Sequence, residues 1–66
     1  MKTSRVKCTA LSSSNSALMI YDENGKEAYI PFQFVIDKKF HEVTKEICEI
    51  TIPTWIAIDR KIKYED

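Results

Sequence analysis

The sequence predicts a small, mostly β domain of the α+β class. We expect four to five antiparallel strands in a curved sheet, or in an SH3-like or OB-like barrel, with one short C-terminal helix. Two apolar, strand-like runs flank Asn24-Gly25, a pair typical of tight hairpin turns. Polar and apolar residues alternate at 5–10 and 47–52, with the period of half-buried strands. A chain of 66 residues has room for one core, so residues 1–66 are expected to form a single domain.

The first strand is expected at about residues 4–11, with Val6, Cys8 and Ala10 facing inward. A cluster of four serines and one asparagine follows at 12–16. Short polar side chains of this kind form hydrogen bonds with nearby backbone groups, which favours turns. We therefore predict a loop between strands there.

The predicted hairpin consists of strands at about 17–22 and 26–30, joined at Asn24-Gly25. We expect a type I′ turn, which requires positive φ angles at both central residues. Residues 17–21 are apolar throughout, a pattern typical of a central strand covered on both faces. Tyr21 and Tyr29 flank the turn and are placed to pair across the two strands.

Pro31 has no backbone N–H, so the strand must kink, end or lie at a sheet edge there. Beyond it we predict a further strand at about 32–37, or a bent continuation of the preceding one. The reason is the alternation that places Phe32, Phe34 and Ile36 on one face. Residues 38–46 are polar, and we expect a connecting loop with one helical turn.

The last strand is expected at about 47–52, with Cys48, Ile50 and Ile52 on its inward face. Pro53 follows, and proline is favoured in the first turn of a helix, so we predict a helix at about 53–62. Its apolar residues are spaced to form one stripe: Trp55, Ile56, Ile58 and Ile62. We therefore expect Trp55 to lie in the core, beneath a helix that crosses the sheet.

The charges balance, with ten basic and ten acidic residues and a net charge of zero. No net field therefore attracts nucleic acid or an anionic membrane. Basic residues gather near both ends of the chain: Lys2, Arg5 and Lys7, then Arg60, Lys61 and Lys63. They would form a small positive patch if the ends meet, although a solvated rim is the commoner role of such residues.

Cys8 and Cys48 are the two cysteines. No signal-like segment precedes them and no apolar run reaches membrane-spanning length, so we expect a cytoplasmic protein with reduced, inward-facing thiols. Together with His41 they supply three metal-ligand types, but no two are spaced as in known zinc sites.

We expect no metal, no cofactor and no catalytic residues. The chain has one histidine and one glycine, and two thiols expected to be inert inside the sheet. It also has little concave volume for a small-molecule pocket. The prediction is therefore a protein that is not an enzyme and has no small-molecule substrate.

Two kinds of binding surface are open to a chain of this type. The apolar surplus after the hairpin marks a candidate protein interface, comprising Tyr29, Phe32, Phe34, Val35 and Ile36. Aromatic and basic side chains form a candidate nucleic-acid surface, comprising Arg5, Lys7, Tyr21 and Lys26. We favour protein binding, including self-association, because a net charge of zero supplies little of the electrostatic affinity for nucleic acid.

Two fragments, ALMIYDENGKEAYIPFQFV and ITIPTWIAIDRKI, join a strand, an acidic turn and YIP to an IxIPxW pattern. Together they resemble small uncharacterised proteins encoded by bacteriophages and prophages, in which a lead such as KAILVEIDGEEHWIP and a tail such as ITIPEWLAEKK recur. The resemblance covers residues 17–36 and 50–61. This chain departs from it at Tyr29, where tryptophan is usual, and at Phe32-Gln33, where Lys-Ser is common.

The resemblance implies a phage-associated cytosolic accessory protein, close to recombination or replication functions, and supplies no site residues. Its action would be protein binding, either self-association or binding and inhibition of a host protein. The alternative is a nucleic-acid-binding small β-barrel associated with recombination or replication.

Overall fold

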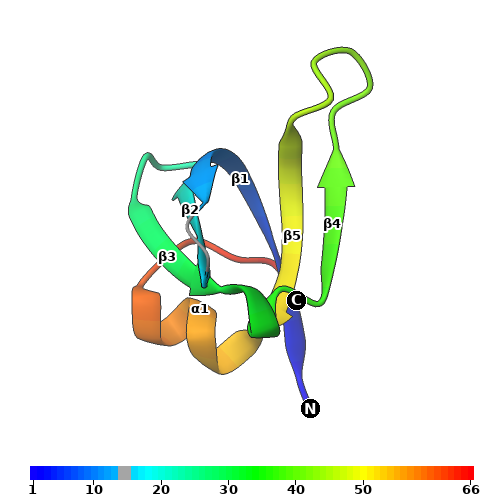
Figure 1. The fold of residues 1–66 in the computed structure, drawn as a ribbon. Coiled ribbons are helices and arrows are strands. Elements are labelled where there is room, and N and C mark those ends of the chain that lie inside the picture. Colours follow the sequence, from blue (N-terminus) through cyan, green and yellow to red (C-terminus); the bar gives the residue numbers. More distant parts are fainter. Residues whose placement is uncertain (14–15) are drawn as a thin grey trace.

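The computed structural model describes residues 1–13 and 16–66. Its elements are β1 (Thr3–Ser13), β2 (Ala17–Asp22), β3 (Glu27–Pro31), the 3-10 turn η1 (Phe32–Phe34), β4 (Asp37–Phe40), β5 (Ile47–Pro53) and α1 (Thr54–Arg60). The five strands form one antiparallel sheet in the order β3-β2-β1-β5-β4. The sheet is open and curved, and α1 lies across one end of it (Figure 1). The predicted fold class, mostly β with one short helix after the last strand, is confirmed.

The sheet curves because β1 pairs with a different neighbour along each half of its length. Its first half pairs with β5, from Thr3↔Pro53 to Lys7↔Glu49. Its second half pairs with β2, beginning at Cys8↔Asp22, and contains a bulge between Ala10 and Ser12. Bulges increase local bending and twist, so the long strand can serve two parts of one curled sheet.

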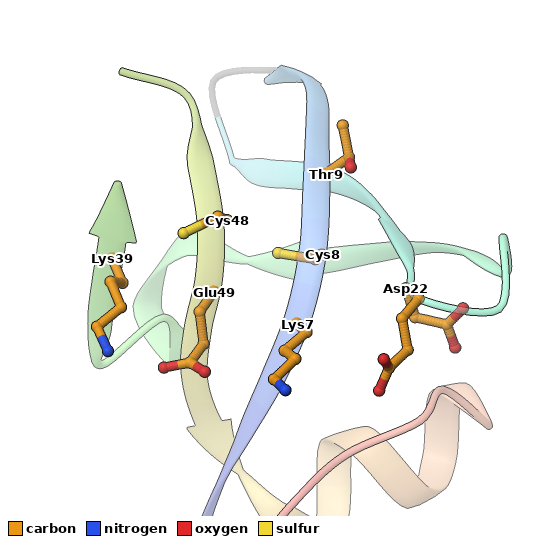
Figure 2. Close-up of a pocket in the computed structure, with 8 residues that line it drawn as sticks. Lys7, Cys8, Thr9, Asp22, Lys39, Cys48 and Glu49 are labelled. Carbon is orange, nitrogen blue, oxygen red and sulfur yellow. The ribbon is translucent and has the colours of Figure 1, made fainter. Parts of the chain in front are cut away.

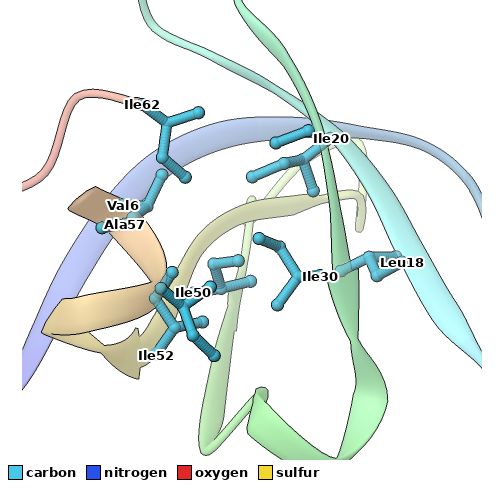
Figure 3. Packing of buried hydrophobic residues seen from close by; sticks show 10 residues of the cluster. Val6, Leu18, Ile20, Ile30, Ile50, Ile52, Ala57 and Ile62 are labelled. Carbon is cyan, nitrogen blue, oxygen red and sulfur yellow. The ribbon is translucent and has the colours of Figure 1, made fainter. Parts of the chain in front are cut away.

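The core fills the concave side of this sheet and the inner face of α1 (Figure 3). Its members are mostly β-branched and come from every element except η1 and β4: Val6, Leu18, Ile20, Ala28, Ile30, Ile50, Ile52, Ile56, Ala57 and Ile62. The prediction that residues 17–21 are covered on both faces was wrong, because Tyr21 is exposed while Leu18 and Ile20 are buried. α1 covers only the concave face, so β2 has one buried side.

The predicted β2–β3 hairpin is present, with Leu18 opposite Ile30 and Ile20 opposite Ala28. Its turn is not type I′, because Gly25 has a φ of 79° but Asn24 is not among the residues with positive φ. Gly25 N donates to Asp22 O (3.0 Å), which is the geometry of a type I turn followed by a left-handed glycine.

The two tyrosines that flank this hairpin do not face each other. Tyr21 lies opposite Glu27, and Tyr29 lies opposite Met19. The expected cross-strand tyrosine pair is therefore absent, because the three-residue turn sets a register that places the two rings on a diagonal.

The predicted strand at 32–37 was wrong. Pro31 ends β3, and Phe32–Phe34 form η1, closed by a hydrogen bond from Val35 N to Phe32 O (3.0 Å). β4 follows at Asp37–Phe40, inside the segment predicted as a loop. This segment carries the chain from edge strand β3 to edge strand β4. Phe34 and Val35 pack against the core here, and this burial overrides the alternating pattern that predicted a strand.

The expected helical turn lies between β4 and β5, where Lys45 N donates to His41 O (3.0 Å). This bond closes a single turn of helical geometry. The β4–β5 hairpin that contains it extends well beyond the other strands (Figure 1). The predicted loop at 12–16 is shorter than expected, because β1 continues to Ser13. Its positions 14–15 lie outside the described residues.

The helix predicted at about 53–62 is present as α1, with Pro53 just before its first residue, and it ends earlier than expected, at Arg60. Lys61 adopts a left-handed conformation (φ 56°) and its N–H donates to Ile58 O (3.1 Å). Ile62 N donates to Ala57 O (3.1 Å), and both of these residues are buried. These bonds form a Schellman motif, in which the left-handed residue ends the helix and the next apolar side chain packs back onto it.

Candidate functional site

The outer face of α1 is apolar and exposed. Trp55 keeps 54% of its surface accessible and Ile58 keeps 58%. These residues are three positions apart, which places them on the same side of a helix. The predicted placement of Trp55 in the core was therefore wrong. Ile56 and Ala57 face the core instead, and the small side chain of Ala57 lies where the helix meets the sheet.

η1 extends this exposed face. The Phe34 ring meets the Trp55 ring edge to face, with centroids 5.5 Å apart and an interplanar angle of 81°. Phe32, in the same short turn, is exposed. We call Phe32, Phe34, Trp55 and Ile58 the aromatic surface. η1 and the start of α1 lie next to each other at the same end of the molecule (Figure 1).

β3 forms the border of the aromatic surface. Arg60 Nε donates to Tyr29 O (3.1 Å), which holds the last turn of α1 against this edge strand. The Tyr29 side chain, 55% exposed, leaves the sheet on the side opposite to buried Ala28 and Ile30. Pro31 is tolerated because β3 is an edge strand. No strand lies on its outer side, so the missing N–H of proline removes no hydrogen bond to a neighbour there.

The five residues predicted as a protein interface are divided between surface and core. Tyr29, Phe32 and Ile36 are exposed, whereas Phe34 and Val35 are half-buried and pack against the core. Sequence analysis missed Trp55 and Ile58 as surface residues. Ala57 could have indicated their exposure. A small residue next to Ile56 favours the side of the helix that approaches the sheet, which leaves Trp55 and Ile58 on the outer side.

The residues predicted as nucleic-acid contacts lie beside acidic groups. The chain ends do meet, since Arg5 and Glu65 exchange backbone hydrogen bonds of 2.7 and 2.8 Å. Lys7 Nζ lies 3.5 Å from Glu65 Oε1 and Lys2 Nζ lies 3.4 Å from Asp66 Oδ2. The basic residues near the start of the chain are therefore neutralised by acidic neighbours rather than gathered into a positive patch.

Tyr21 and Lys26, the remaining candidates for nucleic-acid contact, are exposed on and after β2. Tyr21 lies opposite Thr9 of β1, so its side chain shares the outward face of the sheet with Lys7. Lys26 lies apart from them, at the end of the hairpin, where its N–H donates to Asp22 Oδ1 (2.8 Å). The four candidates do not form one cluster.

Asp22 is a buried carboxylate whose oxygens are occupied by backbone donors. Oδ1 accepts hydrogen bonds from Asn24 N and Lys26 N, and Oδ2 accepts one from Lys63 N, each at 2.8 Å. Burial raises the pKa of Asp22, but the three N–H donors and the Lys26 charge outweigh it, so the pKa lies below its ordinary value. This side chain joins the hairpin to the segment after α1, and it is not poised for proton transfer.

A groove of about 440 Å³ opens between β1 and β5 (Figure 2). Its lining mixes both charges with two thiols: Lys7, Cys8, Thr9, Asp22, Glu23, Lys39, Cys48 and Glu49. Burial raises the pKa of Cys8 to about 11, and the neighbouring Cys48 and Glu49 add to this effect. A thiol of this kind is protonated at neutral pH and is a poor nucleophile.

His41 is not part of the groove lining and lies at the start of the β4–β5 turn. Its Nδ1 accepts hydrogen bonds from Val43 N (3.1 Å) and Thr44 N (3.3 Å), which gives it a local structural role. Among residues 1–13 and 16–66, no three His, Cys, Asp or Glu side chains are grouped to hold a metal ion.

Comparisons with family models, curated proteins and solved structures find no significant match to this chain. Within the part of the chain that the structure describes, no helix has the length and apolar character needed to cross a membrane.

Proposed function

We propose that this protein is a non-enzymatic binding protein that uses its aromatic surface to bind another protein chain, either a second copy of itself or a different polypeptide. One observation carries the proposal: Trp55 is more than half exposed although the chain has a separate, well-buried core. Large aromatic side chains on a surface are typical of the energetic centres of protein interfaces.

The composition of the aromatic surface supports this proposal. Phe34 holds the Trp55 ring in one orientation, so little side-chain freedom would be lost when a partner covers it. Charged groups lie at its margin, where Arg60 pairs with Asp59. An apolar centre with charged groups at the rim is the usual anatomy of a protein–protein interface.

The charge distribution disfavours the alternative, nucleic-acid binding. Arg5 Nη2 donates to Asp66 O (3.2 Å) and Lys7 Nζ lies 3.5 Å from Glu65 Oε1, so groups of this chain would compete with phosphates for both side chains. An accessory role in a bacteriophage or prophage, implied by the sequence resemblance, would make a host protein the natural partner to test alongside self-association.

The test compares the wild-type chain with the double variant Trp55→Ser/Ile58→Ser. Self-association is measured by sedimentation over a range of concentrations, and capture of other proteins is measured from nuclease-treated host lysate. We expect binding by the wild type that persists at high salt, because apolar contacts are not screened. The double variant should fold and lose that binding.

The matched control is Lys38→Ala/Lys39→Ala, which alters two exposed side chains of β4 on the other edge of the sheet. It should bind as the wild type does. Binding that vanishes after nuclease treatment, falls steeply with salt and depends on Arg5 and Lys7 would instead establish nucleic-acid binding and refute the proposal.

A further inference from the structure

The fold places the two cysteines on neighbouring strands at equivalent positions. Lys7↔Glu49 is the last matched pair of the β1–β5 ladder, and the next residue on each strand is Cys8 or Cys48. Paired residues of antiparallel strands, such as Lys7 and Glu49, have Cα atoms about 4.5–5.5 Å apart. Cys8 and Cys48 lie one residue beyond that pair, and disulfides span Cα separations of about 4.4–6.8 Å.

Both thiols are free, half-buried and part of the lining of the same groove. Figure 2 shows the Cys8 sulfur directed towards β5 and the Cys48 sulfur turned to the β4 side of its strand. Cys48 is the extra residue of a bulge, because Lys39 pairs with Glu49 and Phe40 pairs with Ile47. A bulged residue has no ladder partner, and the proposed bond requires a rotation about χ1 of Cys48 that brings its sulfur from the β4 side to the Cys8 side.

We propose that Cys8 and Cys48 are a redox-sensitive modification site that forms a reversible intrachain disulfide by exchange with a small-molecule disulfide such as oxidised glutathione. In the reduced protein the groove between β1 and β5 is open. In the oxidised protein the bond ties these strands together where their ladder ends and closes the groove. The projecting β4–β5 hairpin is then fixed to the body of the sheet.

The exchange proceeds in two balanced steps. Cys48 loses its proton and its sulfur attacks glutathione disulfide, breaking that S–S bond and releasing one glutathione thiolate, which takes up a proton. Cys8 then loses its proton and attacks the Cys48 sulfur of the mixed disulfide, forming the intrachain bond and releasing the second glutathione. Two protein thiols are oxidised and one small disulfide is reduced to two thiols.

The protonation of Cys8 sets the rate of the second step. Because its pKa is raised to about 11, the closing step should accelerate as pH rises from 7 towards that value. The reduced state should therefore persist through brief exposure to an oxidant at neutral pH, and the mixed disulfide at Cys48 should be the species seen first.

The experiment equilibrates the full chain with defined ratios of oxidised and reduced glutathione, quenches it with acid and counts free thiols under denaturing conditions. We expect both thiols to disappear together, a mass loss of about 2 Da for two hydrogens, and a Cys8–Cys48 linked peptide after digestion. Oxidation should raise Tm by at least about 10 °C, since the bond closes a long loop in the unfolded chain. Reduction with dithiothreitol should reverse each change.

The matched control is Cys48→Ser, whose fold is verified by far-ultraviolet circular dichroism. It should show no rise in Tm with oxidant, and its remaining cysteine should be either a free thiol or a mixed disulfide with glutathione. Stable mixed disulfides on both wild-type cysteines, bonds formed only between molecules, or two thiols that stay free at equilibrium would each overturn the proposal.

Discussion

Asp22 is the side chain through which the hairpin and the segment after α1 are joined. Its three backbone hydrogen bonds reach Asn24 and Lys26 within the turn and Lys63 beyond the helix. A buried carboxylate is costly unless its oxygens are satisfied, and here each is. This one residue therefore couples local turn geometry to the packing of α1.

Replacement of Asp22 by asparagine should destabilise the fold by about 1–3 kcal/mol at pH 7, since charge-assisted bonds to buried donors are lost. The pKa of Asp22 is lower in the folded state than its unfolded value of about 3.9. Its stabilising contribution is therefore complete above that pH and is lost as pH falls through the folded-state value. Urea unfolding between pH 7 and 3 measures the free energy of unfolding of both proteins. The difference in this free energy between wild type and Asp22→Asn should become smaller below about pH 4.

The control for this measurement is Glu23→Gln, which removes an exposed carboxylate whose partner is Lys63 at 3.3 Å. Surface ion pairs of this kind contribute about 0–1 kcal/mol, so its effect should be small. If the difference in unfolding free energy between wild type and Asp22→Asn stays constant across the whole pH range, the negative charge of Asp22 does not stabilise the fold as proposed.

Gly25 is the second residue that decides the hairpin. A Cβ added there would meet no atom within 4 Å, so the obstacle to substitution is the φ of 79° rather than space. Gly25→Val should cost about 1–2 kcal/mol in chemical denaturation, because side chains with a Cβ resist this left-handed conformation. Asn24→Ala is the control and should stay within about 0.5 kcal/mol. Equal costs at the two positions would indicate the type I′ turn that the sequence favoured.

At the scale of elements, α1 shows how a short helix divides its residues between core and surface. Ile56 is almost fully buried and Ala57 is completely buried, whereas Trp55 and Ile58 face outward. Four consecutive apolar residues, 55–58, allow more than one rotation of the helix about its axis. The rotation that occurs places the smallest of them, Ala57, at the sheet.

This rotation is tested by two alanine variants measured with urea. Ile56→Ala should cost about 2–5 kcal/mol, the usual effect of emptying a core position. Trp55→Ala should cost only about 0.5–1.5 kcal/mol, the value of its ring contact with Phe34. The reverse order would place the indole in the core.

The segment between β3 and β5 is the element that could not be predicted from local pattern. Residues 32–37 alternate as a strand does, yet the chain there must cross from one edge of the sheet to the other. η1 makes the crossing, and β4 forms later because Lys38 and Lys39 pair with Ile50 and Glu49 of β5. Strand pairing of this kind depends on a partner that lies further along the chain.

In the molecule as a whole, the two ends of the chain lie together, with Glu65 and Asp66 beside basic residues near the start of the chain. Arg5 pairs with Glu65 through the backbone, and the side chains of Lys2 and Lys7 lie beside Asp66 and Glu65. Net charge alone does not reveal this arrangement. We expect this arrangement to prevent the clustered basic residues from acting as a phosphate-binding strip.

Reversal of both acidic charges, Glu65→Lys/Asp66→Lys, should create such a strip. We expect the variant to bind single-stranded DNA at low salt in fluorescence anisotropy, with an affinity that falls steeply as salt is added. The wild type should not bind. The control Glu42→Lys/Glu46→Lys has the same net charge but places it in the β4–β5 turn, and it should bind less tightly. Equal binding by both variants would show that net charge alone governs the effect.

Local sequence patterns were enough to predict the hairpin around Gly25, the strands β1 and β5, and a helix near Pro53. Of the five residues predicted as a protein interface, Tyr29, Phe32 and Ile36 are exposed. These features follow from periodicity, turn residues and proline, which act over a few neighbouring positions. Three further features appear only in the tertiary structure: the outward position of Trp55, the meeting of the chain ends, and the placement of Cys8 and Cys48 one residue beyond the last β1–β5 pair. Those features depend on which distant strands pair and on how closely α1 approaches the sheet, and no local pattern contains that information.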